Sequence, residues 1–347
     1  MNAEIVAATD IATASFAGRV LAHDIEVTVG ATKMRLRKGH ILTDADLPAL
    51  VAANRTLHLL RLEPGDVHED GAARRLAAAV AGPGIQIGDP HESMITLRAN
   101  ERGLLAVDAD RLLEINSIPD MSVWTLFDAQ IVRDRQAVAG VKVTPLVTRD
   151  TFLNDAERIA GSGSPVVAIK PFVPRQVGVI VREQLLPAAG ERFREAITRK
   201  VEWFGSRIVA MVHPLDNADG VAAAMHELTA SGADLIMCAG VTSTDPLDVT
   251  VRAMDALGAQ WEKRGVPAHP GSTYWLAYLG ATPVLGMASC GMFSRATVLD
   301  LILPRFFVGE HVTARTLAAL GHGGLLNKGM AFRFPDYAGP EIAAADE

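Results

Sequence analysis

The stretch "CAGVTSTDPLDVT", residues 238–250, places hydroxyl groups and carboxylates directly after an apolar run. Hydroxyls and free backbone N–H groups at a helix start can bind a phosphate. Asp245 can equally cap a helix that begins at Pro246, with Asp248 in its first turn, and neither acid then needs a ligand. The candidates for ligand contact in this stretch are Gly240, Thr242, Ser243, Thr244, Asp245 and Asp248.

Two later stretches also combine glycine and serine with an expected helix start, "VPAHPGSTYWLAYLG" (266–280) and "GMASCGMFSRATVLDLILPRF" (286–306). A turn of small residues lets the backbone approach an anionic group closely, although a plain turn before a packed helix explains the same pattern. The first stretch predicts a helix that carries Tyr274, Trp275 and Tyr278. The candidate ligand contacts are Pro270, Gly271 and Ser272 in the first, and Ser289, Gly291 and Ser294 in the second.

Arg182 and Glu183 follow the apolar run "VGVIV" and occupy an equivalent position. They could reach an anionic ligand group such as a phosphate, whereas ordinary surface charge is the alternative interpretation. We include Glu183 among the candidate contacts. The chain contains no Gly-x-Gly-x-x-Gly, Walker, His-Glu-x-x-His or Gly-x-Ser-x-Gly motif, so none of these established signatures assigns a reaction.

These stretches belong to a series of elements that is typical of a parallel sheet covered by helices. After Arg175 the apolar runs "VGVIV", "RIVAMV", "DLIMCAG" and "TPVLGMAS" alternate with helix-like segments centred on Phe193, Ala223, Ala253 and Leu299. In such sheets the ligand lies beyond the carboxyl ends of the strands, where the three loops above would gather.

The first half of the chain predicts smaller units. A helix is expected over about 68–79, ending at the "AGPG" breaker, and another over 109–116 within short alternating strands. The predicted division is an N-terminal α+β region over 1–84, a small β-rich domain over 85–150, a connector over 151–174, an α/β domain over 175–330 and a tail over 331–347.

Composition excludes several classes of protein. The formal net charge of the 347 residues is -7 and no basic face is indicated, which argues against a nucleic-acid partner. No apolar run is long enough to cross a membrane and the first residues do not resemble a signal peptide, so we expect a soluble cytoplasmic protein. Cys238 and Cys290 are expected to be packing residues.

The order of "VGVIVREQL", "GADLIMCAGVTSTDPLDVT", "HPGSTYWLAYLGATPVLGMASCGMF" and "LPRF" resembles a molybdopterin-binding domain of the molybdopterin molybdotransferase and gephyrin family, over about 173–310. The resemblance implies a three-layer αβα domain with a mostly parallel sheet, beside a smaller β-rich N-terminal region. It also implies molybdopterin or molybdenum cofactor as ligand, Mg²⁺, a homo-oligomer and an apo-molybdoenzyme as partner.

The resemblance implies roles for the candidate residues as well. Asp245 and Asp248 would be catalytic in molybdate insertion, Asp245 would hold the metal, and Ser243 and Ser289 would donate to phosphate. The sequence departs from the family pattern at Val241, at "VREQL" after the first strand and at "ASCG" over 288–291. The leading interpretation is a molybdopterin- or cofactor-binding protein of molybdenum cofactor biosynthesis whose chemistry is molybdate insertion or delivery. The departures motivate the alternative, a non-catalytic carrier or chaperone of the cofactor that has lost the metal site.

Overall fold

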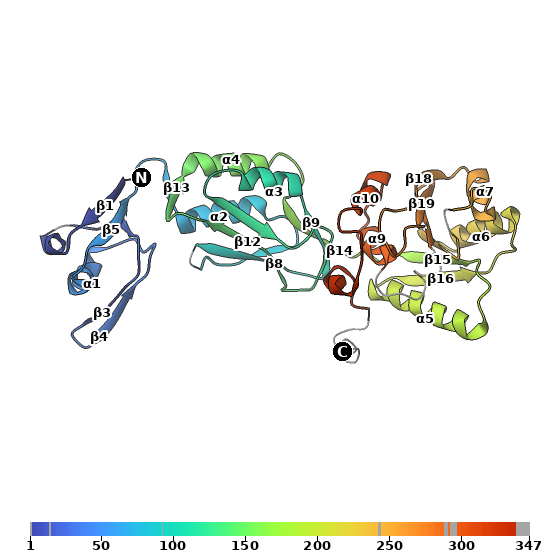
Figure 1. Ribbon diagram of the computed structural model, residues 1–347, viewed down its shortest axis with the longest axis horizontal. Helices are drawn as coiled ribbons and strands as arrows, with labels where there is room; N and C mark the ends of the chain where they lie inside the picture. The colour runs from blue at the N-terminus through green and yellow to red at the C-terminus, as the bar shows by residue number, and fades with distance from the viewer. Residues whose placement is uncertain are drawn as a thin grey trace. The chain divides into compact units, whose positions relative to one another are not determined.

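The computed structural model describes residues 2–13, 15–91, 93–241, 244–287, 291 and 297–337. The chain forms two compact units, whose elements are labelled in Figure 1. The first unit comprises residues 1–101, 105–128 and 132–169. The second comprises residues 102–104, 129–131 and 170–347. It contains every stretch in which the sequence predicts candidate ligand contacts.

The N-terminal part of the first unit is built from short antiparallel strands and one small helix. Strands β1, β5 and β2 form a sheet in that order, and β3 and β4 form a hairpin. Its core includes Leu21, Leu50, Leu57 and Leu59. The elements are β1 (Asn2–Val6), η1 (Ala8–Thr13), β2 (Arg19–Leu21), β3 (Ile25–Val29), β4 (Thr32–Leu36), η2 (Asp44–Asp46), α1 (Leu47–Ala53) and β5 (Leu57–Arg61).

The rest of the first unit packs helices against a four-stranded sheet of order β10-β12-β8-β7. Both helices predicted here are confirmed, as α2 and α3, and the expected connector over 151–174 contains most of a further helix and a strand. The elements are β6 (Asp66–His68), α2 (Glu69–Val80), β7 (Ile85–Ile87), β8 (Met94–Ala99), β9 (Gly103–Val107), α3 (Ala109–Asn116), β10 (Met121–Thr125), β11 (Ile131–Val132), β12 (Ala137–Val143), β13 (Val147–Arg149), α4 (Asp150–Ala160) and β14 (Val167–Pro171).

The second unit contains a six-stranded, mostly parallel sheet of order β16-β15-β17-β20-β19-β18. Strands β16, β15, β17 and β20 are parallel, whereas β19 and β18 run antiparallel to their neighbours. The strands are β15 (Gln176–Val181), β16 (Arg207–Val212), β17 (Leu235–Ala239), β18 (Gln260–Arg264), β19 (Trp275–Leu279) and β20 (Thr282–Met287). The helices are α5 (Pro187–Trp203), α6 (Ala218–Ala230), α7 (Val249–Ala256), α9 (Val298–Phe307), α10 (Ala314–Ala319) and η3 (Lys328–Arg333).

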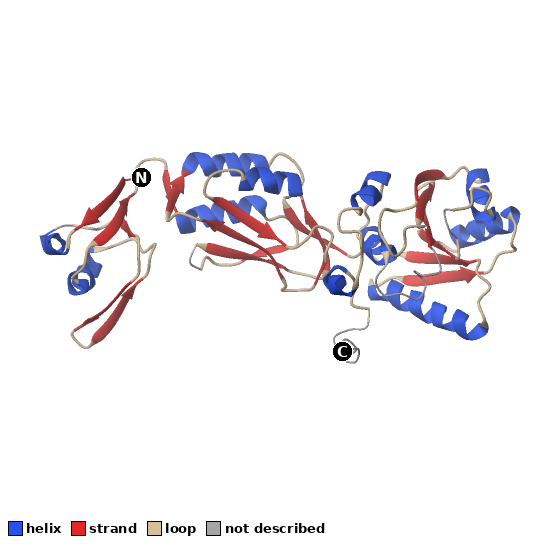
Figure 2. Ribbon diagram, in the orientation of Figure 1, coloured by secondary structure: helices blue, strands red, loops and turns tan. Residues whose placement is uncertain are grey.

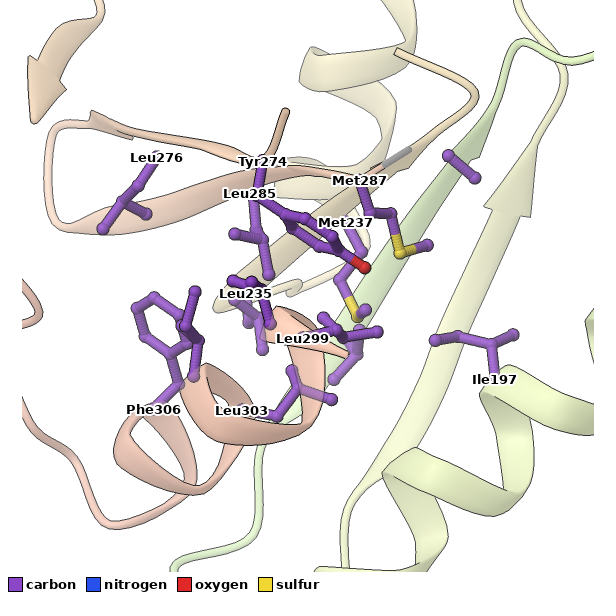
Figure 3. Close-up of a cluster of buried hydrophobic side chains, with 14 of the residues drawn as sticks. Ile197, Leu235, Met237, Tyr274, Leu276, Leu285, Met287, Leu299, Leu303 and Phe306 are labelled. Carbon is purple, nitrogen blue, oxygen red and sulfur yellow. The ribbon is translucent and has the colours of Figure 1, made fainter. Parts of the chain in front are cut away.

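Alternation of side chains along the strands produces two apolar cores, one on each face of this sheet. In β17, Leu235 and Met237 contribute to the core under α5 and α9, and Ile236 and Cys238 contribute to the core under α6 and α7. Figure 3 shows the first of these cores, and Figure 2 shows the helices around the strands. The predicted three-layer αβα arrangement is therefore confirmed.

The segment after the Pro-Gly-Ser turn is a strand, so the predicted helix through Tyr274, Trp275 and Tyr278 is wrong. Tyr274 and Tyr278 lie in the core on one face of the sheet, and Trp275 lies in the core on the other. This period of two is the signature of a buried strand, and aromatic residues favour strands over helices.

Candidate functional site

The carboxyl ends of β15, β16, β17 and β20 lie on the same side of the sheet because these strands are parallel. We call this side the carboxyl edge. Trp275, the first residue of antiparallel β19, pairs with Gly286 near the end of β20. The connection from β18 to β19, residues 265–274, therefore also reaches the carboxyl edge. The strands thus bring the predicted loops to one side of the molecule.

Gly240 joins three strand ends at this edge. Its backbone N–H donates to the carbonyl of Met287 over 3.2 Å, which ties the end of β17 to the end of β20. Its φ is +80°, and a Cβ at this position would lie 2.8 Å from Cβ of Glu183 and 2.9 Å from the Glu183 amide nitrogen. Glycine is required here both by the left-handed backbone and by the close approach of the loop after β15.

Tyr274 joins the other two predicted loops. A Cβ on Gly271, whose φ is +115°, would lie 2.9 Å from the Tyr274 ring, and a Cβ on Gly291 would overlap the Tyr274 hydroxyl. The carbonyl of Pro270 accepts the Val298 N–H at the start of α9 over 3.1 Å. The Pro-Gly-Ser turn and the segment that leads into α9 are therefore neighbours. Figure 3 shows the Tyr274 ring beside Met287 and Leu285.

Not all candidate contacts lie within the described residues. Ser272 is exposed and its carbonyl accepts the Val266 N–H, and Thr244 is exposed. Four candidates lie outside the described residues, namely Thr242, Ser243, Ser289 and Ser294. Ligand contact by any of these residues stays a prediction.

The Arg182 guanidinium connects three loops of the carboxyl edge. Its Nη1 lies 2.7 Å from each carboxylate oxygen of Asp248 and 3.1 Å from Oγ1 of Thr250, and its Nη2 lies 2.7 Å from Oδ1 of Asp216. The side chains of Arg182 and Asp248 are only 14% and 19% exposed, whereas Asp216 is 80% exposed. This arrangement is a partly buried ion pair with one additional surface partner.

Asp248, and not Asp245 as predicted, is the N-cap of the following helix. Its Oδ1 accepts the Thr250 N–H over 2.7 Å, and α7 begins at Val249. Asp245 lies in the turn before the helix, is exposed, and accepts the Leu247 N–H over 2.8 Å. Asp248 is therefore already bound to a cation and a helix start, while Asp245 faces solvent.

The helix starts at this edge differ in how their free N–H groups are used. Asn217 caps α6, Asp248 caps α7, and Thr297 with Asp300 forms a capping box at α9. Helix α5 begins after Leu186 without a side-chain cap and without an acid in its first turn. The expectation that the helix starts of this edge supply positive potential therefore holds best for α5.

A cavity of about 600 Å³ lies at the start of α5, between the loops that follow β15 and β16. This volume is in the range of small-molecule sites. Its charged side chains are two guanidinium groups and three carboxylates. The lining residues include Arg182, Glu183, Leu185, Pro187, Gly190, Glu191, Phe193, Arg194, His213 and Asp216.

The described residues of this edge do not fit a bound Mg²⁺. Magnesium needs several oxygen ligands in octahedral geometry. Both oxygens of Asp248 face Arg182, and one oxygen of Asp245 is taken by a backbone N–H. Within the ranges that the structure describes, no three His, Cys, Asp or Glu side chains are grouped to hold a metal ion. The implied role of Asp245 as a metal ligand therefore has no supporting geometry here.

Cys238 is a packing residue, as predicted, because it is fully buried in β17. Burial raises the pKa of its thiol to about 12; the nearby charge of Arg182 lowers this pKa slightly and that of Asp248 raises it slightly. The thiol is therefore protonated at neutral pH and is not a nucleophile. Cys290 lies outside the described residues.

Sequence reasoning missed two members of this site. Thr250 binds Arg182, and Arg194 lines the cavity about two turns into α5. A helical spacing of Pro187, Gly190 and Arg194, three and four residues apart, places them on one face and was the available signal for Arg194. Thr250 carried no comparable signal, because its partner is 68 positions away in the chain.

A second cavity, of about 770 Å³, lies in the first unit. Three basic side chains, Arg35, Arg37 and Lys38, face it together with three acids, Asp24, Glu69 and Asp70. The Asp24 carboxylate accepts the Lys38 N–H and an Arg35 N–H, and these bonds lower its pKa.

A family model described as a probable molybdopterin binding domain matches residues 177–307, and a model for a domain of unknown function, DUF8806, matches residues 10–53. No curated protein matches the chain by sequence. None of the described helices is both long enough and apolar enough to cross a membrane.

Two solved structures are similar to the chain at low identity. A molybdopterin biosynthesis MoeA protein from Pyrococcus horikosii is 13% identical, with a TM-score of 0.32, over 91% of this chain and 75% of that one. A candidate molybdenum cofactor biosynthesis protein from Corynebacterium diphtheriae is 12% identical, with a TM-score of 0.28, over 42% of this chain and 99% of that one.

Proposed function

We propose that this chain, which contains a domain of the molybdopterin-binding family, binds a molybdopterin-type ligand at the carboxyl edge and carries it without modifying it. A role in molybdenum cofactor biosynthesis follows from the family of the domain. The finer assignment, a cofactor carrier or chaperone that delivers to an apo-molybdoenzyme, is supported by the chemistry of the edge.

The observation that carries the proposal is the pairing of Asp248 with Arg182. Molybdate insertion as the resemblance implies it needs acids that are free to position a metal ion. Asp248 instead binds a guanidinium with both oxygens and caps α7, and Asp245 is an exposed turn residue. The loops of the edge nevertheless pack closely at Gly240, Gly271 and Gly291, where added side chains would clash with Glu183 or Tyr274, and the cavity at the start of α5 lies beside them. Binding without metal-dependent turnover agrees with both features.

The ligand itself would be recognised by its apolar ring and its phosphate. Leu185 and Pro187 provide apolar surface in the cavity, and Arg194 together with the uncapped start of α5 provides positive potential. Glu183 lines the cavity, and its carboxylate would accept hydrogen bonds from the amino groups of a pterin ring.

Calorimetric titration with a pterin monophosphate tests the binding, and a molybdate-insertion assay on the same preparation tests the chemistry. We expect saturable binding and no insertion. Gly240→Ala should weaken binding by about tenfold or more, because the new Cβ pushes the loop of Glu183 out of place. Gly258→Ala is the matched control, since its φ is +73° and no atom lies within 4 Å of the added Cβ.

The proposal fails in two separable ways. Absence of binding in the unaltered chain removes the ligand site altogether. Binding together with molybdate insertion that depends on Asp245 and Asp248 replaces the carrier by the molybdotransferase. The assembly of the chain into a homo-oligomer, a further expectation from the family, is measured independently by sedimentation.

A further inference from the structure

The acids of the carboxyl edge come from loops that are far apart in sequence, and Arg182 is the group that holds them together. Asp216 follows β16 and Asp248 follows β17, and the Arg182 guanidinium binds both over 2.7 Å. The Arg182 backbone N–H also donates to the carbonyl of Ala239, at the end of β17, over 3.1 Å. Two carboxylates thus converge on a single positive centre.

We infer that Arg182 occupies the position of a cation at this edge, so that the described residues around it form no divalent-metal site and the chain binds its ligand without one. A divalent ion and a guanidinium can both hold carboxylates from separate loops, but they cannot do so at the same place. The guanidinium provides five fixed donors and remains charged in proteins. A metal ion would need the same carboxylate oxygens as ligands.

Burial of the ion pair opposes replacement of the Arg182 guanidinium by a metal ion. With 14% of the Arg182 side chain and 19% of the Asp248 side chain exposed, the pair is only weakly screened by solvent. Burial by itself lowers the pKa of Arg182, but the bonds to Asp248 and Asp216 outweigh this effect and raise it. No accessible pH therefore removes the charge and frees the carboxylates for a metal ion.

The inference makes a specific prediction about the chain without Arg182. Arg182→Ala leaves Asp216 and Asp248 facing a vacant position with no positive charge between them. Carboxylates brought together by a fold but left without a counter-charge attract a divalent cation. Removal of one arginine should therefore create a metal site that the unaltered chain does not have.

Mn²⁺ is the probe, because its electron paramagnetic resonance signal falls when it binds, so that no pterin is needed. The full-length chain and its variants are titrated with Mn²⁺ alone. We expect Arg182→Ala to bind one Mn²⁺ per chain about tenfold or more tightly than the unaltered chain, which corresponds to about 1.4 kcal/mol.

Three variants serve as controls. Arg194→Ala removes the same charge from the same cavity, but Arg194 is exposed and its nearest acid is Glu191 at 3.9 Å, so no gain is expected. Arg182→Lys keeps the positive charge and should also gain nothing. Arg182→Ala combined with Asp248→Asn should lose the gained site. Circular dichroism verifies folding, and Arg182→Gln replaces Arg182→Ala if the latter does not fold.

The inference is overturned if the unaltered chain binds Mn²⁺ stoichiometrically and Asp248→Asn abolishes that binding. It is equally overturned if Arg182→Ala and Arg182→Gln bind Mn²⁺ no better than Arg194→Ala.

A second measurement rests on the proposed function. Calorimetry with a pterin monophosphate, in EDTA and in excess Mg²⁺, should give affinities within about twofold of each other. An affinity that requires Mg²⁺ contradicts the inference and leaves the ligand site intact. A lack of pterin binding under both conditions contradicts the proposed function, while the Mn²⁺ result still decides the inference.

Discussion

Nζ of Lys200 lies 2.6 Å from Oδ1 of Asp300, and both side chains are buried between α5 and α9. The same Asp300 oxygen accepts the Tyr337 hydroxyl over 2.9 Å, and its other oxygen accepts the Thr297 N–H at the start of α9. This ion pair therefore connects α5 to the start of α9. The Tyr337 hydroxyl adds the segment after η3 to the same contact.

Replacement of Lys200 by Met should destabilise the second unit strongly. The change leaves Asp300 charged and buried without its cation, which typically costs about 3–5 kcal/mol. Arg199→Met is the control, because Arg199 is exposed on the same helix and should change the free energy of unfolding by less than about 0.5 kcal/mol. Urea denaturation of both variants makes the comparison. Equal values for the two variants would contradict the prediction.

Asp245 and Asp248 should differ sharply in their contribution to folding. Asp248→Ala removes the cap of α7 and leaves the Arg182 guanidinium without its main partner, so we expect a loss of about 2–4 kcal/mol. Asp245→Ala removes only a turn bond at an exposed position and should cost less than about 1 kcal/mol. Thermal and chemical unfolding of the single variants measure both. A smaller loss for Asp248→Ala than for Asp245→Ala would show that the ion pair is not retained in solution.

Gly240→Ala should be more destabilising than Gly258→Ala. Both glycines have positive φ, at +80° and +73°, so the two variants share the backbone penalty of about 1–2 kcal/mol. Only at Gly240 does the new Cβ meet a backbone atom, the amide nitrogen of Glu183 at 2.9 Å. We expect the difference between the two free energies of unfolding to exceed about 1 kcal/mol. Identical values would place the loop of Glu183 elsewhere.

The thiol of Cys238 should not react in the folded protein. Its pKa is raised by burial to about 12, so at pH 8 the thiol is almost entirely protonated as well as inaccessible. In a Cys290→Ser background, an aromatic disulfide reagent should label the chain only after unfolding. Labelling at pH 8 as fast as that of a free thiol would contradict this assignment. Labelling that rises only above about pH 11 would agree with the raised pKa.

Much of the second unit could be predicted from local pattern, because its parallel strands are continuous apolar runs and its helices lie between them. The strand through Tyr274, Trp275 and Tyr278 could not be predicted, because a short apolar segment after a Pro-Gly turn fits a helix equally well. Only the burial of its side chains on both faces of the sheet identifies it as a strand.

The site was predictable in place but not in detail. Gly240 and the Pro-Gly-Ser turn could be assigned to the carboxyl edge from strand order alone. Which of Asp245 and Asp248 caps the helix could not, because the choice depends on Arg182, 66 positions earlier in the chain. The pairing of Arg182 with Asp216 and Asp248 is likewise a property of tertiary contacts that no local spacing encodes.

The hairpin of β18 and β19 has a consequence for how this domain can vary. That pair turns back at residues 265–274, where Val266, Ala268 and Tyr274 anchor the connection in the core under α5 and α9 while Pro267, His269 and Ser272 stay exposed. Substitutions at the exposed positions of this connection can therefore change its outer surface at the carboxyl edge without removing apolar side chains from either core.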